Sequence, residues 1–387
     1  MRFPEFSGEW KKTSIGECFS KVENGLTYDT DNTSGVPVTR IETISDKSIN
    51  YDRVGYANID DKISKYEMQY GDVLFSHINS LKHIGKTAFY DAAQPLYHGM
   101  NLLLLRAKKS LDSKFLYYTL NTHKFLHRCQ VLANQAVNQA SINTKELKSI
   151  NISVPQMQEQ QKISGLISLL DERIETQKKI IEDLKKLKDA ICNMNFTSGS
   201  ALKLGNVGKF VRGLTYSASD VIDDTMGTAV MRSNNISNGD PANFEELIWV
   251  NKTPNHEQIL RGGDIIICMA NGSSPLVGKA SYYIDCGMES ATVGAFCGIY
   301  RSYNPLAKWL FQSKHYKKHI QRCIQGGNGA IANIYPEDIL AISFNIPSGY
   351  ERVLNVLNSL EEKYLLEQKL LYRYLAVKSH LLAQMFI

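Results

Sequence analysis

The stretch PQMQEQQKISGLISLLDERIETQKKIIEDLKKLKDAICNMNF, residues 155–196, decides the fold of this chain. Its apolar residues recur at alternating steps of four and three, which is the spacing of a coiled-coil seam. Charged residues fill the other faces, so we expect a long helix that needs an apolar partner. The seam residues are Ile163, Ile167, Leu170, Ile174, Ile181 and Leu184, interrupted by Gln177, and the pattern then moves to Leu187, Ile191 and Met194.

The C-terminus supplies that partner. The stretch LEEKYLLEQKLLYRYLAVKSHLLAQMF, residues 360–386, aligns without a gap on residues 170–196, at a constant offset of 190. Any two amphipathic helices can be aligned by chance, but the rest of the chain repeats at nearly the same offset, which indicates an internal duplication. The corresponding seam residues of the second helix are Val353, Leu357, Leu360, Tyr364, Leu371 and Tyr374.

Length and composition indicate an ordinary globular protein. The 387 residues, 43% hydrophobic and 21% charged, leave room for two or three domains. The seven cysteines include no CxxC pair, which favours a reducing cytoplasm over a disulfide framework. Neither a signal peptide nor a membrane-spanning stretch is evident, so we expect a soluble, cytoplasmic protein. A net charge of +5 permits nucleic-acid binding without establishing it.

Outside the two helices the chain consists of two copies of one module. Each copy carries Gly-Leu-Thr-Tyr, a short apolar run entered through Gly-Asp, and a Gly-Lys turn. These features predict mixed α and β structure. Each copy ends with a strand and a proline directly before its helix. The paired segments are GLTY (25–28 and 213–216), GDVLF with GDIII (71–75 and 263–267), IGKTAFY with VGKASYY (84–90 and 277–283), and ISVP with FNIP (152–155 and 344–347).

Catalytic and metal-binding motifs are weak throughout. The Gly-Lys pairs lack the glycine spacing of a phosphate loop and fit turns between strands better. His123 with His127, and His315 with His319, could share a helical face, but no third ligand is evident, so we expect no metal. The segment at Asn304 lacks the second proline and the aromatic residue of an adenine methyltransferase loop. We therefore expect no catalytic residue in this chain.

Polar loop residues suited to reading base edges recur between the same repeat landmarks. Amide side chains can pair with adenine, and lysine or arginine with guanine or phosphate. Such residues also simply populate loops, but their concentration in both modules favours DNA binding. The predicted phosphate contacts are Lys86 and Lys279, and the predicted base or backbone contacts are Arg40, Asn79, Asn134, Asn138, Arg232, Asn234, Asn271 and Asn328.

Taken together, these residues resemble the specificity (S) subunit of type I restriction-modification systems. The resemblance rests on Phe6 and Trp10 in the N-terminal lead, on the strand-proline endings, on the glutamine-rich helix start PQMQEQQKI and on the paired repeat helices. The second helix start, SGYER at 348–352, lacks the glutamine run. The implied fold is α+β, with two pseudo-repeated mixed α/β target-recognition domains separated by two long antiparallel coiled-coil helices. The domains are residues 1–155 and 197–349, and the helices are residues 156–196 and 350–387.

The resemblance implies a non-catalytic subunit whose two domains each read one half of a bipartite double-stranded DNA site. The helices would act as a spacer and would dock methyltransferase (M) subunits, expected to be two. A coil of about 30 residues is about 45 Å long, the length of about 13 base pairs. S-adenosylmethionine, ATP and Mg would belong to the M and the restriction/translocase (R) subunits, with no cofactor in this chain. No membrane partner is expected.

Two alternatives remain open. A self-contained restriction endonuclease would cut DNA unaided in the presence of a divalent metal. A two-module coiled-coil adaptor would bind protein ligands and show no DNA preference even beside a methyltransferase. The DNA target and its gap length do not follow from the sequence, because base preference depends on loop geometry and on DNA deformation.

Overall fold

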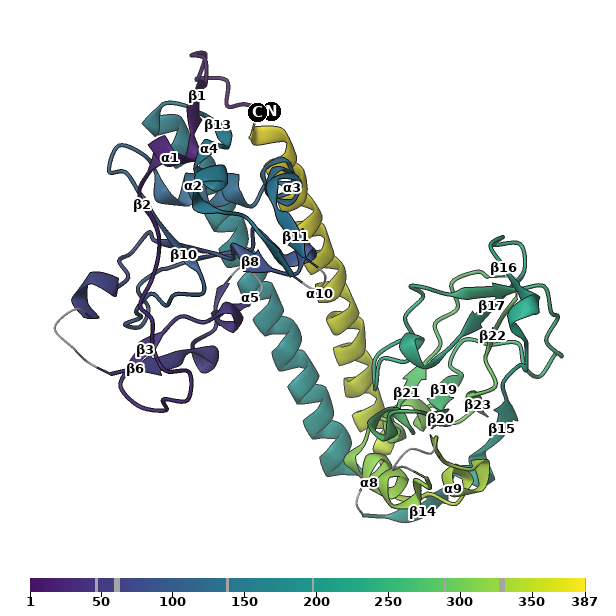
Figure 1. Cartoon of the computed structure of the whole chain (residues 1–387). Helices are drawn as coiled ribbons and strands as arrows, with labels where there is room; N and C mark the ends of the chain where they lie inside the picture. Colours follow the sequence, from purple (N-terminus) through teal and green to yellow (C-terminus); the bar gives the residue numbers. More distant parts are fainter. Residues whose placement is uncertain are drawn as a thin grey trace. The chain divides into compact units, whose positions relative to one another are not determined.

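The structure of the protein is a computed structural model, which describes residues 1–45, 48–58, 63–136, 139–196, 198–288, 290–326 and 331–386. The chain forms two compact units, Met1–Lys178 with Lys369–Ile387, and Lys179–Gln368. Each unit contains one module and one end of both long helices, α5 (Met157–Asn195) and α10 (Tyr350–Met385) (Figure 1). In the described parts of the chain, no helix combines the length and apolarity needed to cross a membrane.

The two long helices pair antiparallel within the first unit. Ile163, near the start of α5, shares a hydrophobic core with Met385 at the end of α10. Farther along α5, Asp171 forms an ion pair with Lys378, which comes earlier on α10. In the second unit the other ends of the helices meet, where Lys188 pairs with Glu361 at 3.0 Å.

The seam differs from the expected pattern in the second half of α5. Leu187 and Met194 are exposed, whereas Lys188 and Cys192 are buried. The steps of four and three continue from Leu184 to Lys188, so the seam does not shift. A lysine can occupy a seam position because its aliphatic stem packs like an apolar side chain while its ammonium pairs with an acid. Of the predicted seam residues, Ile163, Ile167, Ile174, Leu357 and Tyr364 are buried, and Leu170, Ile181, Leu184, Val353, Leu360, Leu371 and Tyr374 are half-buried.

Each module is built on a four-stranded antiparallel sheet with the same strand order. The first sheet, ordered β2-β10-β7-β9, contains β2 (Phe19–Asn24), β10 (Leu103–Ala107), β7 (Val73–Phe75) and β9 (Thr87–Phe89). The second, ordered β15-β23-β19-β21, contains β15 (Gly208–Arg212), β23 (Cys297–Ser302), β19 (Ile265–Cys268) and β21 (Ala280–Tyr282). The apolar runs after Gly-Asp form β7 and β19, as the sequence predicts.

Both sheets contain an ion pair with a buried aspartate at the same place. Asp72, directly before β7, binds Arg106 of β10 through two bonds of 2.7 Å. Asp264, directly before β19, binds Arg301 of β23 through bonds of 2.8 and 2.7 Å. Both arginines have a raised pKa because the hydrogen-bonded carboxylate stabilises the charged guanidinium. The ion pair explains why the Gly-Asp motif recurs in both modules.

Each module also carries helices and a two-stranded pair that joins it to its long helix. The helices are α1 (Ile15–Cys18), α2 (Ser113–Leu120), α3 (His123–Leu132) and α4 (Thr144–Ser149) in the first module, and α6 (Leu204–Val207), α7 (Ala307–Leu310), α8 (Lys314–Cys323) and α9 (Pro336–Leu340) in the second. The pairs are β1 (Lys11–Ser14) with β13 (Asn151–Val154), and β14 (Ser200–Lys203) with β25 (Ser343–Ile346). β13 and β25 each end one residue before the proline that precedes the long helix.

The modules differ in their peripheral strands. The first has two separate pairs, β3 (Val36–Val38) with β6 (Gly55–Ala57), and β4 (Ile44–Ser45) with β5 (Ser48–Ile49). The second has one continuous sheet, ordered β16-β18-β17-β22, of β16 (Val221–Ile222), β18 (Ile248–Val250), β17 (Thr228–Met231) and β22 (Ala291–Val293). The shared sheet is thus the conserved frame of the duplication, and the periphery varies.

The start of α5 is fixed by a buried acid. Glu159 accepts two hydrogen bonds of 2.7 Å from Arg2 and one of 3.2 Å from the indole of Trp10. The neighbouring Gln160 accepts from the backbone of Asp112 and donates to the carbonyl of Pro155. The N-terminal lead and the glutamine-rich start therefore serve one purpose, which is to hold the first module on its helix.

Candidate nucleic-acid interface

In the first module, two of the predicted DNA-reading amides lie on one small sheet. β8 (Ile78–Asn79) pairs with β12 (Gln139–Ser141), and β12 pairs with β11 (Asn134–Ala136). Asn79 stands opposite Ala140, and Asn134 stands opposite Ser141. Asn134 is exposed, whereas Asn79 is half-buried. Asn138, predicted as a third contact between these strands, lies outside the described residues.

The second module repeats this small sheet. β20 (Ala270–Asn271) pairs with β24 (Ala332–Asn333), and Gln325 forms a further bridge with Asn333. The predicted Asn271 therefore occupies the position of Asn79 in the first module. Asn328 lies outside the described residues, in the segment between Gln325 and β24.

The two equivalent asparagines use part of their amide to hold the backbone. Asn79 donates to the hydroxyl of Ser76 at 3.2 Å and accepts from the backbone of Ser80 at 2.8 Å. Asn271 donates to the hydroxyl of Ser233 at 3.1 Å and accepts from the backbone of Ser273 at 2.9 Å. Asn79 keeps one further N–H and one lone pair, whereas the amide of Asn271 is also within hydrogen-bonding reach of the Cys268 thiol. Asn79 can contact a base through those two groups only, and Asn271 would have to exchange its contact with the thiol for one with a base.

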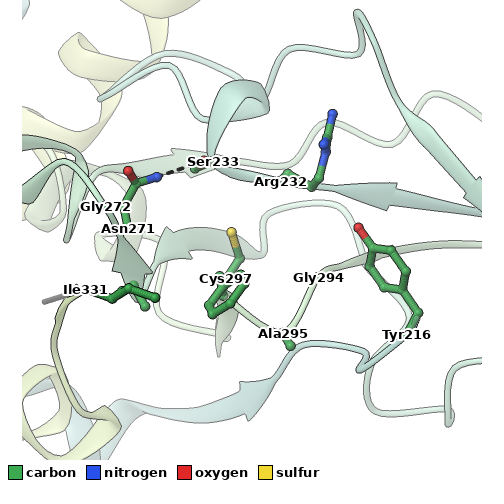
Figure 2. A pocket seen from close by; sticks show the side chains of 11 residues that line it. Tyr216, Arg232, Ser233, Asn271, Gly272, Gly294, Ala295, Cys297 and Ile331 are labelled. Atoms are coloured by element: carbon green, nitrogen blue, oxygen red, sulfur yellow. Dashed lines mark hydrogen bonds between the residues drawn. The ribbon is translucent and has the colours of Figure 1, made fainter. Parts of the chain in front are cut away.

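A pocket of about 380 Å³ opens beside Asn271 in the second module, and Figure 2 shows the side chains around it. The predicted Arg232 and Asn271 both line this pocket, together with Tyr216 and Cys297. The rings and aliphatic groups at its edge are exposed, because 64% of Phe296 and 54% of Ile331 remain accessible. Polar groups within an apolar lining are typical of a ligand site.

Arg232 is the strongest polar feature of the pocket. Its Nε is buried and finds no hydrogen-bond partner among the residues whose placement the structure gives. The carboxamide oxygen of Asn333, on β24 beside Asn271, is buried and unpaired within the same set of residues. Leaving a buried donor or acceptor unsatisfied costs about 1–3 kcal/mol. Asn333 does not itself line the pocket, but its strand pairs with β20, whose Ala270 and Asn271 do. An unpaired donor such as the Arg232 Nε suits a ligand that offers an acceptor, as a base edge does.

A tyrosine and an arginine recur together in both modules. In the second module Arg232 and Tyr216 line the same pocket. In the first module burial raises the pKa of the Tyr28 hydroxyl, and the charge of Arg40 is close enough to oppose that rise. Arg40 and Arg232 each start a short helical turn, η1 (Ile41–Thr43) or η6 (Ser233–Asn235), and each donates its backbone N–H to the side chain three residues on, at 2.8 Å. The predicted Asn234 is exposed on the second turn.

The Gly-Leu-Thr-Tyr motif places these tyrosines. A Cβ on Gly25 would lie 2.0 Å from the carbonyl oxygen of His98, and one on Gly213 would lie 2.2 Å from that of Gly294. Only glycine permits such an approach. In the sequence the motif marks the repeat. The recurrence of its tyrosine in both copies was the available signal that Tyr28 and Tyr216 belong to the site.

The Gly-Lys turns pack against α3 and α8. Gly85 has a φ of +84°, and its Cβ position lies 2.9 Å from Leu126 of α3; Gly278 has a φ of +78°, and its Cβ position lies 2.1 Å from Ile320 of α8. These are turns between strands, as the sequence indicates, and not phosphate loops. The predicted phosphate contacts are the lysines directly after these glycines in the sequence. Lys86 is exposed and Lys279 is half-buried.

The histidine pairs form no metal site in the described structure. The rings of His123 and His127 stack at 6.4 Å, and His315 packs against Phe344 at 5.0 Å. Over the ranges that the structure covers, no group of three His, Cys, Asp or Glu side chains is placed to hold a metal ion.

Comparison with known proteins connects this geometry to one family. The model of the family described as "Type I restriction modification DNA specificity domain" matches residues 7–186. The protein named "Putative type I restriction enzyme MjaX specificity subunit", from Methanocaldococcus jannaschii, is 40% identical over 200 residues, which cover 50% of this chain and 47% of that protein. The EcoKI specificity subunit of Escherichia coli K12 is 30% identical over 156 residues, covering 37% and 32%. The chain thus spans less than half the length of these relatives.

Solved structures extend the similarity in fold over the full length. The S subunit of a type I restriction-modification system from M. genitalium superposes with a TM-score of 0.61 at 16% identity, covering 100% of this chain and 99% of that one. A chain from a study of complex assembly and conformational transition of the type I R-M system gives a TM-score of 0.51 at 13% identity, covering 98% and 97%. These matches confirm the resemblance that the sequence predicts and its α+β fold.

Proposed function

We propose that this chain, a relative of the type I restriction-modification specificity subunits, is the DNA-reading subunit of such a complex and that each module reads one half of a bipartite site. The observation that carries the proposal is the repeated placement of polar groups. Arg40 and Asn79 in the first module correspond to Arg232 and Asn271 in the second, on the same sheet framework. Two equivalent sets of polar residues, one in each module, suit a DNA target with two halves.

In the second module the pocket beside Asn271 would read a base. A guanidinium can donate two hydrogen bonds to guanine, and the rings of Phe296 and Tyr216 offer apolar surface to a base or a thymine methyl group. Asn333, which pairs with Ala270 of the pocket lining, would add an acceptor next to the pocket. In the first module, Arg40 and Asn79 would serve the other half-site, with the exposed Asn134 on the same small sheet as Asn79.

The chemistry of modification and cleavage would belong to partner subunits. Methyltransferase subunits, two by the resemblance, would dock on the long helices and bind S-adenosylmethionine, and a restriction subunit would use ATP and Mg. This chain would be non-catalytic and would contribute position and sequence selectivity. Its lysines and arginines can make the phosphate contacts that set position, and its amides and arginines can make the base contacts that set selectivity.

The test is long-read methylation mapping of DNA from cells that express this chain with its methyltransferase subunit, compared with cells that lack this chain. We expect a methylated split motif that disappears with the chain. An unchanged methylation pattern, with assembly of the complex demonstrated, would reject the proposal in favour of a protein adaptor. Metal-dependent cleavage by the purified chain alone would favour an endonuclease.

A further inference from the structure

Helix α8 of the second module carries an uninterrupted stripe of positive charge. Its sequence, KHYKKHIQRC, contains four Lys or Arg residues and no Asp or Glu. Lys314, Lys318 and Arg322 follow one another at steps of four, so they lie on one face, about 6 Å apart along the helix axis. All three are exposed. Like charges at this spacing destabilise an isolated helix by a few tenths of a kcal/mol per pair, so the stripe does not serve folding.

The opposite face of α8 fixes where this stripe lies. Tyr316 and Ile320 are buried, and the hydroxyl of Tyr316 donates to the carbonyl of Gly278 at 2.9 Å. The helix is therefore packed against the turn that carries Lys279. At its other end, α8 leads through Ile324 into Gln325, which bridges to the small sheet of Asn271. The C-terminal end of the helix, where Arg322 lies, is thus two residues of chain away from the strand bridge that adjoins the candidate reading surface.

No acid within the described structure neutralises the stripe. The ion pairs among the placed residues include no side chain of α8. Asp338 of α9, whose charge reaches Cys323, accepts the backbone N–H of Tyr335 at 2.9 Å. The fourth cation, Lys317, is half-buried on the side of Cys192 of α5 and is not part of the exposed face.

The first module has a shorter copy of the stripe. Lys124 and Arg128 of α3 are exposed, are separated by four residues, and belong to a helix without Asp or Glu. α3 packs on Gly85, beside Lys86, as α8 packs on Gly278. It leads through Ala133 into Asn134 of the first small sheet. Two modules with different peripheral strands have therefore retained the same charged element in the same place.

We propose that the exposed faces of α8 and α3 bind the phosphate backbone of DNA that flanks each half-site. This inference rests on the proposed function and adds to it an element outside the reading pocket. A row of cations without acids matches a polyanion, and backbone contacts position a protein without specifying sequence. Removal of these charges should weaken binding to every duplex alike and leave the recognised motif unchanged.

The experiment uses the full chain assembled with its methyltransferase subunit and a 40-base-pair duplex that lacks the motif. Lys318→Gln with Arg322→Gln is compared with Lys203→Gln with Arg212→Gln, which removes two exposed charges of the same module from β14 and β15. We expect the α8 pair to bind roughly tenfold or more weakly at 0.1 M salt. The slope of log K against log salt should fall in magnitude by about 1.8, because each lost phosphate contact removes about 0.9.

The control pair should keep the parent slope, and Lys124→Gln with Arg128→Gln should behave like the α8 pair. Equal slopes for the α8 pair and the control pair would overturn the inference. So would an α8 pair whose only defect is weaker assembly with the methyltransferase subunit, since the face would then be a protein surface. If the parent complex itself methylates no split motif, the proposed function fails instead, which separates the two outcomes.

Discussion

His98 is a buried titratable group whose protonation opposes folding. Only 2% of it is accessible, and its Nε2 lies 3.0 Å from the carbonyl oxygen of Leu102. Burial lowers its pKa from the ordinary value of 6.5 to about 4. Below pH 6.5 the unfolded chain therefore binds a proton that the folded chain does not. Stability is fully present above pH 6.5 and is lost as the pH falls toward 4, by up to about 3 kcal/mol.

We expect His98→Leu to flatten this pH dependence. Urea unfolding, followed by hydrogen exchange of β10 in the first unit, should give a smaller loss of unfolding free energy between pH 7 and pH 5 in the variant than in the parent. His127→Leu, at an exposed histidine, is the control, and its unfolding free energy should change with pH as it does in the parent. Equal slopes for parent and His98→Leu would show that His98 does not carry the effect.

The Asp264–Arg301 ion pair predicts a large local loss of stability when it is broken. The two side chains are 3% and 5% exposed. Asp264→Asn would leave the buried guanidinium with only the exposed carboxylate of Glu257, 3.7 Å away, as counter-charge, and we expect a loss toward the lower end of the range of about 3–5 kcal/mol for a broken buried pair. Hydrogen exchange in β19 and β23 should accelerate accordingly, while Asp223→Asn at an exposed position should not change it. An unchanged exchange rate in Asp264→Asn would contradict the structural role of the pair.

For single residues, the sequence identified which positions matter more readily than it identified the residues that contact them. Asp72 and Asp264 were recognisable as repeat landmarks, but their arginines lie on another strand, and no local pattern joins them. Arg232 and Asn271 were predicted separately as DNA contacts, and only the fold shows that they line one pocket with Tyr216. The DNA-contact role of the predicted residues stays a prediction.

Among the elements, the long helices are tied to the modules by two equivalent charged clusters. In the second unit, Lys188 pairs with Glu361, which also accepts a hydrogen bond from Tyr282 of the module. In the first unit, Lys378 pairs with Asp171, which accepts from Tyr118 at 2.9 Å. Both pairs follow the repeat offset of 190 residues that the sequence shows. They differ in burial, since Lys188 and Glu361 are 2% and 4% exposed and Lys378 and Asp171 are 18% and 31% exposed.

This difference in burial predicts that the same Lys→Met substitution lowers the free energy of unfolding by different amounts in the two units. Lys188→Met should destabilise the second unit by about 3 kcal/mol, because the buried Glu361 would lose its ion-pair partner and keep only the Tyr282 hydroxyl as donor and the charge of the nearby Lys308. Lys378→Met should cost the first unit less than about 1 kcal/mol, because solvent screens a more exposed pair. Hydrogen exchange of the helix ends in each unit measures both, and adding Glu361→Leu to Lys188→Met should recover part of the loss. Equal costs at the two sites would contradict this account.

The seam shows what periodicity can and cannot predict. Steps of four and three identified both helices because apolar residues dominate the pattern. A search for apolar residues alone selects Leu187 as the next seam residue. The residue buried in the seam is Lys188, whose ion pair allows the lysine to be buried. Recognition of that position required the partner acid on the other helix, which lies far away in sequence.

For the whole molecule, duplication was the most informative property of the sequence. It predicted two modules and two helices, and the strand orders of the two sheets extend the equivalence to topology. The small sheets that carry Asn79 and Asn271 were not predicted, since their strands have two or three residues and no periodic signal. Nor were the different peripheral strands, because these depend on contacts within each module.

The central claim is that each module reads one half of a split DNA site, and matched substitutions of Arg40 and Arg232 test it most directly. Methylation would be mapped in cells that express the parent, Arg40→Gln or Arg232→Gln with the methyltransferase subunit, after assembly of each complex is verified. Loss of one arginine–base contact costs about 1–3 kcal/mol of discrimination. We predict that each variant relaxes or changes a different half of the motif and leaves the other half and the gap intact. A variant that alters both halves equally, or two variants that alter the same half, would contradict the claim.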